Sequence, residues 1–103
     1  MLFELERFRQ LRLRALDTLC DRLTRAGRLN EALEAGLLSV AGEPLRESAH
    51  RALMRLHLAD GNTGEAVRQY RLYERLLREQ VGIEPSERIQ ELVRGLDNPE
   101  TVR

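Results

Sequence analysis

The chain has 103 residues, and its 17 basic residues are balanced by 17 acidic residues, so its net charge is zero. That length suits one compact domain, and 42% hydrophobic residues is ordinary for a globular protein, which argues against disorder. Every basic residue is arginine, which excludes a Schiff-base lysine and the lysine of a phosphate-binding loop, and neutrality supplies no overall attraction to nucleic acid or acidic lipid.

Apolar spacings of three and four predict a first helix that begins near the N-terminus and ends at Gly27. Its predicted buried face consists of Leu5, Phe8, Arg12, Ala15, Leu16, Leu19, Leu23 and Ala26. Cys20 lies beside this face, so we expect a buried, inert thiol. A single cysteine excludes an internal disulfide and favours a reducing, cytoplasmic location. The sequence contains no run of about 20 apolar residues, so no membrane helix is predicted.

Two further helices are predicted in the middle of the chain. The second begins at Asn30, a good N-cap, and is broken at Gly42. Pro44 is expected in the first turn of the third helix, which ends near Gly61. The inward residues predicted for the third helix are Leu45, Ala49, Ala52, Leu53 and Leu56.

The remaining part of the chain predicts a fourth helix and a short fifth one. Asn62 and Glu65 have the spacing of a capping box at the start of the fourth helix, and Gly82 ends it. Pro85-Ser86-Glu87 opens the fifth helix. No segment alternates with period two, so the predicted fold class is all-α, with one domain over residues 1–98 and a C-terminal tail at 99–103.

An internal repeat appears when the sequence is shifted by 34 residues. Gly27 then coincides with Gly61, Ala32 with Ala66, and Leu19 with Leu53. A helix-turn-helix period of 34 residues is the tetratricopeptide signature. We therefore predict antiparallel helix pairs in a right-handed stack, with the fifth helix or a second copy covering the end.

Several motifs together resemble the bacterial transcriptional activator domain, the tetratricopeptide-like module of antibiotic regulatory protein type regulators. The most specific are Pro44-Leu45-Arg46-Glu47 and Val81-Gly82-Ile83-Glu84-Pro85-Ser86, with Tyr70 and the run from Tyr73 to Leu77 between them. The likeness extends from about Leu11 to Leu96.

This resemblance implies a cytoplasmic regulator in which DNA is bound by a separate winged-helix domain, expected to lie outside these 103 residues. The module itself would contact proteins: a second copy in a homodimer, a neighbouring domain or the transcription machinery. The alternative is a free-standing tetratricopeptide-like adaptor unrelated to transcription. A small helical enzyme is a third and weaker alternative, and neither the membrane nor a cofactor is an expected partner.

One candidate partner-binding surface is a stripe of arginines on the fourth helix. The stripe consists of Arg68, Arg71, Arg75 and Arg78. It could dock an acidic partner or DNA phosphates, but pairs such as Glu74 with Arg78 and Arg75 with Glu79 favour a solvated helix face.

A second candidate surface is the groove that the repeat register places along the first and third helices. Arginines there could grip carboxylates with bidentate hydrogen bonds, and the candidates are Arg14, Arg25, Arg51 and Arg55. The other groove positions are Asp17, Asp21, Thr24, Ser48, Leu58 and Ala59. Asp17 and Asp21 are expected on an exposed helix face, where they form salt bridges.

The sequence supports neither catalysis nor metal binding. His50 and His57 are seven residues apart, whereas helical metal pairs use a spacing of one turn, so a structural or solvent role is expected. No nucleophile has an evident base and orienting group. Tyr70 and Tyr73 lie among apolar residues and are expected to pack between helices.

Overall fold

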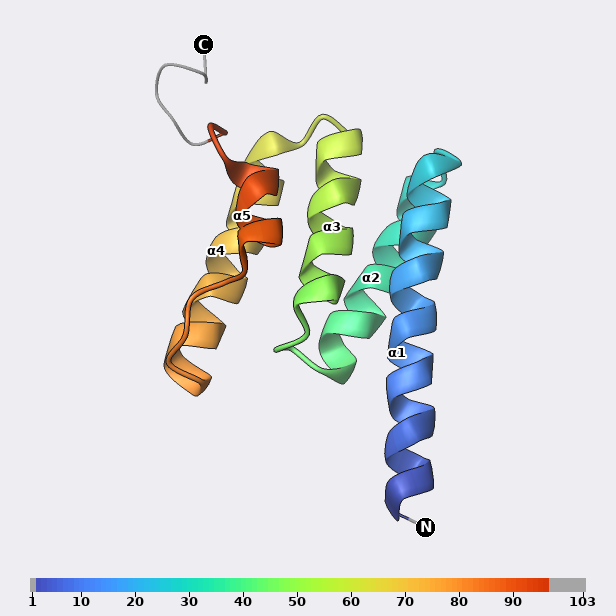
Figure 1. The fold of residues 1–103 in the computed structure, drawn as a ribbon. Coiled ribbons are helices and arrows are strands. Elements are labelled where there is room, and N and C mark those ends of the chain that lie inside the picture. The colour runs from blue at the N-terminus through green and yellow to red at the C-terminus, as the bar shows by residue number, and fades with distance from the viewer. Residues whose placement is uncertain (1, 97–103) are drawn as a thin grey trace.

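A computed structural model describes residues 2–96, in which five α-helices and no strand are present, confirming the all-α fold class (Figure 1). The predicted boundary at residue 98 and the tail at 99–103 lie outside the described residues. The helices are α1 (Leu2–Arg25), α2 (Leu29–Gly42), α3 (Glu47–Ala59), α4 (Thr63–Gln80) and α5 (Glu87–Val93).

The helices stack as two neighbouring pairs. α1 packs against α2, and α3 packs against α4, with successive helices running in opposite directions (Figure 1). Contacts of α3 with both α1 and α2 join the pairs, and α5 lies against α3 and α4. None of the helices of the described part of the chain is both long and apolar enough to cross a membrane.

Glycines at the helix ends make the turns that the repeat predicted. Gly27 and Gly61, which coincide in the 34-residue register, have φ angles of 76° and 74°. Gly82 has a φ angle of 78° after α4. Only glycine adopts this left-handed conformation without steric cost, which is why all three helices end where the sequence predicted.

The core consists of two clusters that meet along α3. The first lies between α1, α2 and α3, and its buried members are Cys20, Ala32, Ala35, Ala52, Leu53 and Leu56. The second lies between α3, α4 and α5, and its buried members are Met54, Tyr70, Tyr73, Leu77, Ile89 and Val93. The small alanines let the first pair approach closely, and both tyrosines pack between helices as predicted.

The predicted buried face of α1 is only partly correct, because the true face is rotated about the helix axis. Leu16 and Leu23 pack against the first core cluster as predicted. The buried residues are Leu13, Asp17 and Cys20, whereas Phe8 is 72% exposed and Leu19 is 46% exposed. Among the described helices α1 contacts only α2 and α3, so several of its apolar residues, such as Phe8, lie where no helix covers them. Its periodicity alone therefore could not locate the core.

Three helix starts differ from their predictions. Asn30, the predicted N-cap of the second helix, lies inside α2, which begins at Leu29 with Arg28 as its N-cap residue. Pro44 lies three residues before α3 and forms part of the preceding turn, because α3 begins only at Glu47. Asn62 is the N-cap residue of α4, but its side chain makes no capping hydrogen bond, so the predicted capping box does not form.

Candidate functional site

A polar groove of about 340 Å³ runs between α1 and α3. It is lined by Gln10, Arg14, Asp17, Thr18, Asp21, Arg46, Ser48, Arg51 and Arg55. Six predicted groove positions are brought together there, whereas Thr24, Arg25, Leu58 and Ala59 are not part of the lining. The 34-residue register placed the groove correctly because it aligned the first helices of the two pairs.

Asp17 is the centre of a buried hydrogen-bond network at one end of this groove. It is only 9% exposed, so the expectation of an exposed carboxylate is wrong. Its Oδ2 accepts hydrogen bonds from Arg46 Nη2 and Ser48 Oγ, both at 2.7 Å, and its Oδ1 accepts one from Ser39 Oγ at 2.6 Å. The network joins α1, α2 and α3, and a buried carboxylate needs such partners to offset its lost hydration.

Sequence reasoning missed Arg46 and Ser39 as partners of Asp17. The sequence singled out Arg46 only as part of a motif, because no helical spacing relates it to Asp17, which lies 29 positions earlier. The signal was the aspartate itself: Asp17 lies one turn from both Leu13 and Cys20, and an acid on a buried face requires a cationic partner.

Two arginines of the groove are already held by acids of the same chain. Arg55 donates to both carboxylate oxygens of Asp21, at 3.0 and 2.8 Å, across one repeat period. Arg51 donates to Glu47 Oε2 at 2.8 Å. Arg14 is exposed in the lining and makes no side-chain ion pair within residues 2–96. An external carboxylate would therefore compete with internal acids for all but Arg14.

Glu47 connects the third and fifth helices. Its Oε1 accepts the backbone N–H of Ser86 at 3.0 Å, and its Oε2 accepts the Ser86 hydroxyl. Burial raises the pKa of Glu47, but hydrogen bonds from Ser86 and the nearby Arg51 outweigh burial and lower the pKa below its usual value. The ionised carboxylate is therefore the form that this contact stabilises.

His50 has the structural role that its spacing from His57 predicted. Its ring is fully buried, with Nε2 2.7 Å from the carbonyl oxygen of Pro44 and Nδ1 2.9 Å from Gln69 Nε2. The ring also lies 4.7 Å from that of Tyr73. Burial lowers the pKa of His50 despite the opposing effect of the Pro44 carbonyl, so the ring is neutral at pH 7. It bridges α3 to α4 and to the turn before α3.

Cys20 is buried and free, as expected for an inert thiol. Burial, assisted by the charge of Asp21, raises its pKa to about 11. Reactive cysteines have lowered values, so this thiol is in its unreactive protonated form. In the described residues no three His, Cys, Asp or Glu side chains gather where they could hold a metal ion.

The four arginines of α4 are all exposed, and acids accompany them. Arg68 pairs with Glu65 at 3.0 Å. Glu74 lies between Arg71 and Arg78, at 3.7 and 3.8 Å, which confirms the predicted pair with Arg78. Arg78 also reaches Glu84 at 3.5 Å. The predicted pair of Arg75 with Glu79 does not form, so Arg75 projects from the centre of the stripe without an ion pair within residues 2–96.

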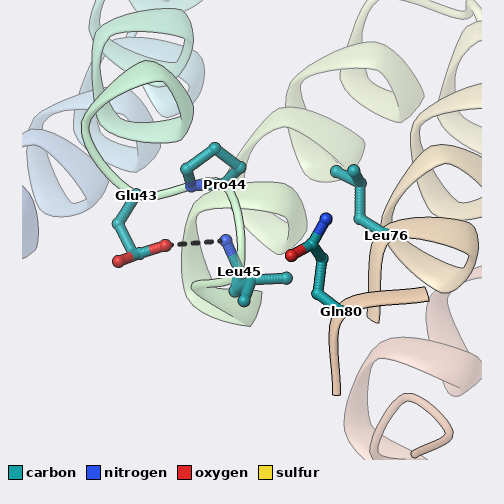
Figure 2. Close-up of a pocket in the computed structure, with 5 residues that line it drawn as sticks. All are labelled: Glu43, Pro44, Leu45, Leu76 and Gln80. Atoms are coloured by element: carbon teal, nitrogen blue, oxygen red, sulfur yellow. Dashed lines mark hydrogen bonds between the residues drawn. The ribbon is translucent and has the colours of Figure 1, made fainter. Parts of the chain in front are cut away.

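A smaller hollow of about 290 Å³ lies between the turn before α3 and the end of α4. Figure 2 shows Leu76 and Gln80 facing Leu45 across it. Glu43 Oε1 accepts the backbone N–H of Leu45 at 3.3 Å, while Glu43 Oε2 pairs with Arg9 at 3.0 Å. These contacts fix the turn, and the hollow is a shallow seam between the two helix pairs.

Comparison with known families identifies the family of this chain. The family model of the bacterial transcriptional activator domain matches residues 1–96, which is nearly the whole chain. The matched range includes α1 to α5 and both of the motifs that meet at Glu47 and Ser86. No curated protein and no solved structure matches the chain.

Proposed function

The chain belongs to the bacterial transcriptional activator domain family, and we propose that it is a protein-interaction module of a bacterial transcriptional regulator. The family match supports a regulatory role over the free-standing adaptor and over the enzyme. A module of this kind works in the cytoplasm, where it presents helix faces to protein partners.

The stripe Arg68, Arg71, Arg75 and Arg78 is the proposed docking surface for an acidic partner. The observation that carries this assignment is the contrast in exposure between the two arginine surfaces, since arginines of both pair with acids of the same chain. In the polar groove the side chains of Arg51 and Arg55 are 17% and 41% exposed. On α4 those of Arg68, Arg71 and Arg78 are 79%, 56% and 59% exposed. On α4 the arginines are exposed on a helix whose other face is anchored in the core by Tyr70, Tyr73 and Leu77. A rigid, exposed helix face suits a protein contact, and arginine is enriched at such contacts.

The polar groove is the weaker docking surface of the two. Arg14 is its available cation, whereas Arg25 lies outside the lining, and Arg51 and Arg55 would have to exchange partners to bind an external carboxylate. Exposed ion pairs contribute little free energy, so the arginines of α4 exchange their own acids for an external carboxylate more readily than Arg51 does in its less exposed pair with Glu47. We therefore assign partner binding to α4 first.

DNA contact is assigned to another part of the regulator. Duplex binding depends on arginine or lysine releasing counterions from phosphates, and this chain is neutral overall. In a gel-shift titration at moderate salt, the chain is expected to bind duplex DNA only weakly. Tight, sequence-specific binding by these 103 residues would contradict the assignment.

A transcription assay tests the proposed function directly. The full chain is fused to an unrelated DNA-binding domain, and output is measured from a bacterial promoter carrying that domain's site. Activation is expected, and the Arg71→Gln/Arg75→Gln variant should reduce it. The matched control is Arg88→Gln/Arg94→Gln, which removes the same charge from exposed positions in and directly after α5. A silent fusion, or equal losses in both variants, would contradict the proposal.

A further inference from the structure

The N-terminal half of α1 carries large apolar residues that the fold leaves in solvent. α1 extends well past the end of α2 (Figure 1). On this overhang Leu5 is 66% exposed and Phe8 is 72% exposed. Exposed apolar residues that line up along one helix face form a contiguous patch and indicate an interaction surface, whereas single exposed apolar residues do not.

The same chain offers an apolar groove that could receive such residues. On the outer face of the first helix pair, a hollow of about 370 Å³ lies between α1 and α2. Its lining residues are Leu16, Leu19, Leu23, Arg28, Glu31, Glu34, Ala35 and Leu38. Leu38 is 52% exposed there, and Leu19 is 46% exposed. The overhang and this outer groove lie on one continuous stripe of α1.

The spacing of the stripe is symmetric about Arg12. Leu5 and Leu19 each lie seven residues from Arg12, while Phe8 and Leu16 each lie four residues from it. If two α1 helices pack antiparallel about a twofold axis at Arg12, Leu5 faces Leu19 of the partner subunit and Phe8 faces Leu16 of the partner subunit. Self-complementarity of this kind is what a twofold interface requires.

We propose that this face binds a second copy of the chain, with the overhang of each α1 inserted into the outer groove of the other. The overhang has no α2 beside it in its own subunit, and the twofold axis supplies the partner's α2 at that level. Each copy thus contributes both a protruding part and a receiving part, and the contact closes on itself as a dimer. This proposal rests on the proposed function, since it names one partner of the interaction module.

Charges at the edge of the stripe are complementary in this arrangement. Glu4 lies one turn before Phe8, and Arg22 lies one turn after Leu19, on the same flank of α1. Both are exposed, and neither forms an ion pair within the described residues. Antiparallel pairing brings Glu4 close to the partner's Arg22 on both sides of the axis. Arg12 meets its own copy at the axis, where the two like charges repel, and a single polar residue in such a seam fixes its register at a cost in stability.

The area of the face is sufficient for a stable dimer. Residues 2–23 run about 32 Å along α1 at the helical rise of about 1.5 Å per residue, and a helix pair is about 20 Å wide. The footprint is therefore on the order of 600 Å² per copy, or about 1,200 Å² in total, which is the lower end of the range for specific interfaces. We therefore expect a moderate dimer affinity, with a dimeric fraction that rises with protein concentration.

Cysteine cross-linking tests the position of the twofold axis. In the Arg12→Cys variant the new thiol faces its own copy, so mild oxidation should give a covalent dimer on a non-reducing gel. Val81→Cys, at an exposed position after α4, is the control and should stay monomeric at the same concentration. The native Cys20 is buried and does not interfere. Equal cross-linking of both variants, or none in either, overturns the proposal.

Sedimentation equilibrium of the full chain tests the contact itself. Phe8→Asp should raise the dimer dissociation constant about 10- to 100-fold, the effect of losing one buried aromatic side chain. Ile83→Asp, at a similarly exposed residue far from α1, should leave that constant unchanged. Circular dichroism of both variants is the control for folding and should give the helical spectrum of the wild-type chain. Equal constants for the two variants, or a wild-type chain that is monomeric at several hundred micromolar, overturn the proposal.

The two proposals fail separately. A monomeric wild-type chain whose fusion still activates transcription contradicts the dimer and leaves the interaction module standing. A dimer broken by Phe8→Asp, together with a silent fusion, supports the dimer and contradicts the role in transcription.

Discussion

Glu47 at the start of α3 holds Ser86, the residue before α5, through both of its carboxylate oxygens. The two residues are 39 positions apart in the sequence. They belong to the two motifs that carry the family resemblance, so those motifs meet at one point of the fold. The contact anchors α5 against α3 and α4, the second helix pair.

Replacement of Glu47 by glutamine should destabilise the protein by about 1.5–3 kcal/mol at pH 7, the range for hydrogen bonds to a charged group. Because the pKa of Glu47 is lowered, its contribution is fully present above the unfolded value of 4.5 and is lost as pH falls through the lower folded value. Urea unfolding at pH 7 and below pH 4 should show the difference shrinking in acid. As a control, Glu79→Gln replaces an exposed glutamate on α4 and should change the free energy of unfolding little at either pH.

The Asp17 network is expected to respond unequally to single and paired changes. Arg46→Leu leaves a buried carboxylate without its cation and should cost about 3–5 kcal/mol. Asp17→Leu with Arg46→Leu removes both charges and should cost much less than the sum of the single changes. A double-mutant cycle by chemical denaturation measures this coupling, and additive losses would show that the pair is not a unit.

His50 should make the protein sensitive to mild acid. Because burial lowers its pKa, the unfolded chain binds a proton near pH 6.5 before the folded protein does. Its contribution is therefore present above pH 6.5 and is lost as pH falls through the lower folded value, with a slope of up to about 1.4 kcal/mol per pH unit. The slope should disappear in His50→Gln and persist in His57→Gln, as followed by the midpoint of urea unfolding at successive pH values.

Two glycines should respond oppositely to replacement by alanine. A Cβ at Gly36 would lie 2.5 Å from Leu53 Cδ2 and 3.2 Å from Cys20 Sγ, so overpacking should cost about 1–3 kcal/mol. At Gly64, in the first turn of α4, a Cβ meets nothing within 4 Å. There the better helix propensity of alanine should stabilise the protein by about 0.5–1 kcal/mol. Thermal unfolding of the two variants tests both signs.

Much of the fold followed from local chemistry. Gly27, Gly61 and Gly82 end helices because glycine adopts the left-handed conformation without a steric penalty. This preference is local and does not depend on how the helices pack. The 34-residue period also placed Asp21 opposite Arg55, since equivalent positions of stacked repeats lie side by side. Helix order, turns and the location of the polar groove were therefore readable from the sequence.

The orientation of α1 was not readable in the same way. Leu13 and Leu19 are chemically equivalent, and a helix with apolar residues over much of its surface has no unique inner face. The close approach of α2 and α3 buries Leu13 and leaves Leu19 at the surface. Likewise, the spacing of Asp17 from Leu13 and Cys20 is a local sign of burial, but no local pattern identifies its partners, which come from two other helices.

The sequence by itself determined the helices, their breaks and the repeat, because these depend on interactions among residues a few positions apart. Only the tertiary structure decided which arginines are already engaged by internal acids and which, like Arg75, remain exposed at the surface. It also decided that the apolar stripe of Leu5, Phe8 and Leu19 is left over after the core has formed. Burial is a property of the packed chain, and it depends on contacts between residues that no local pattern connects.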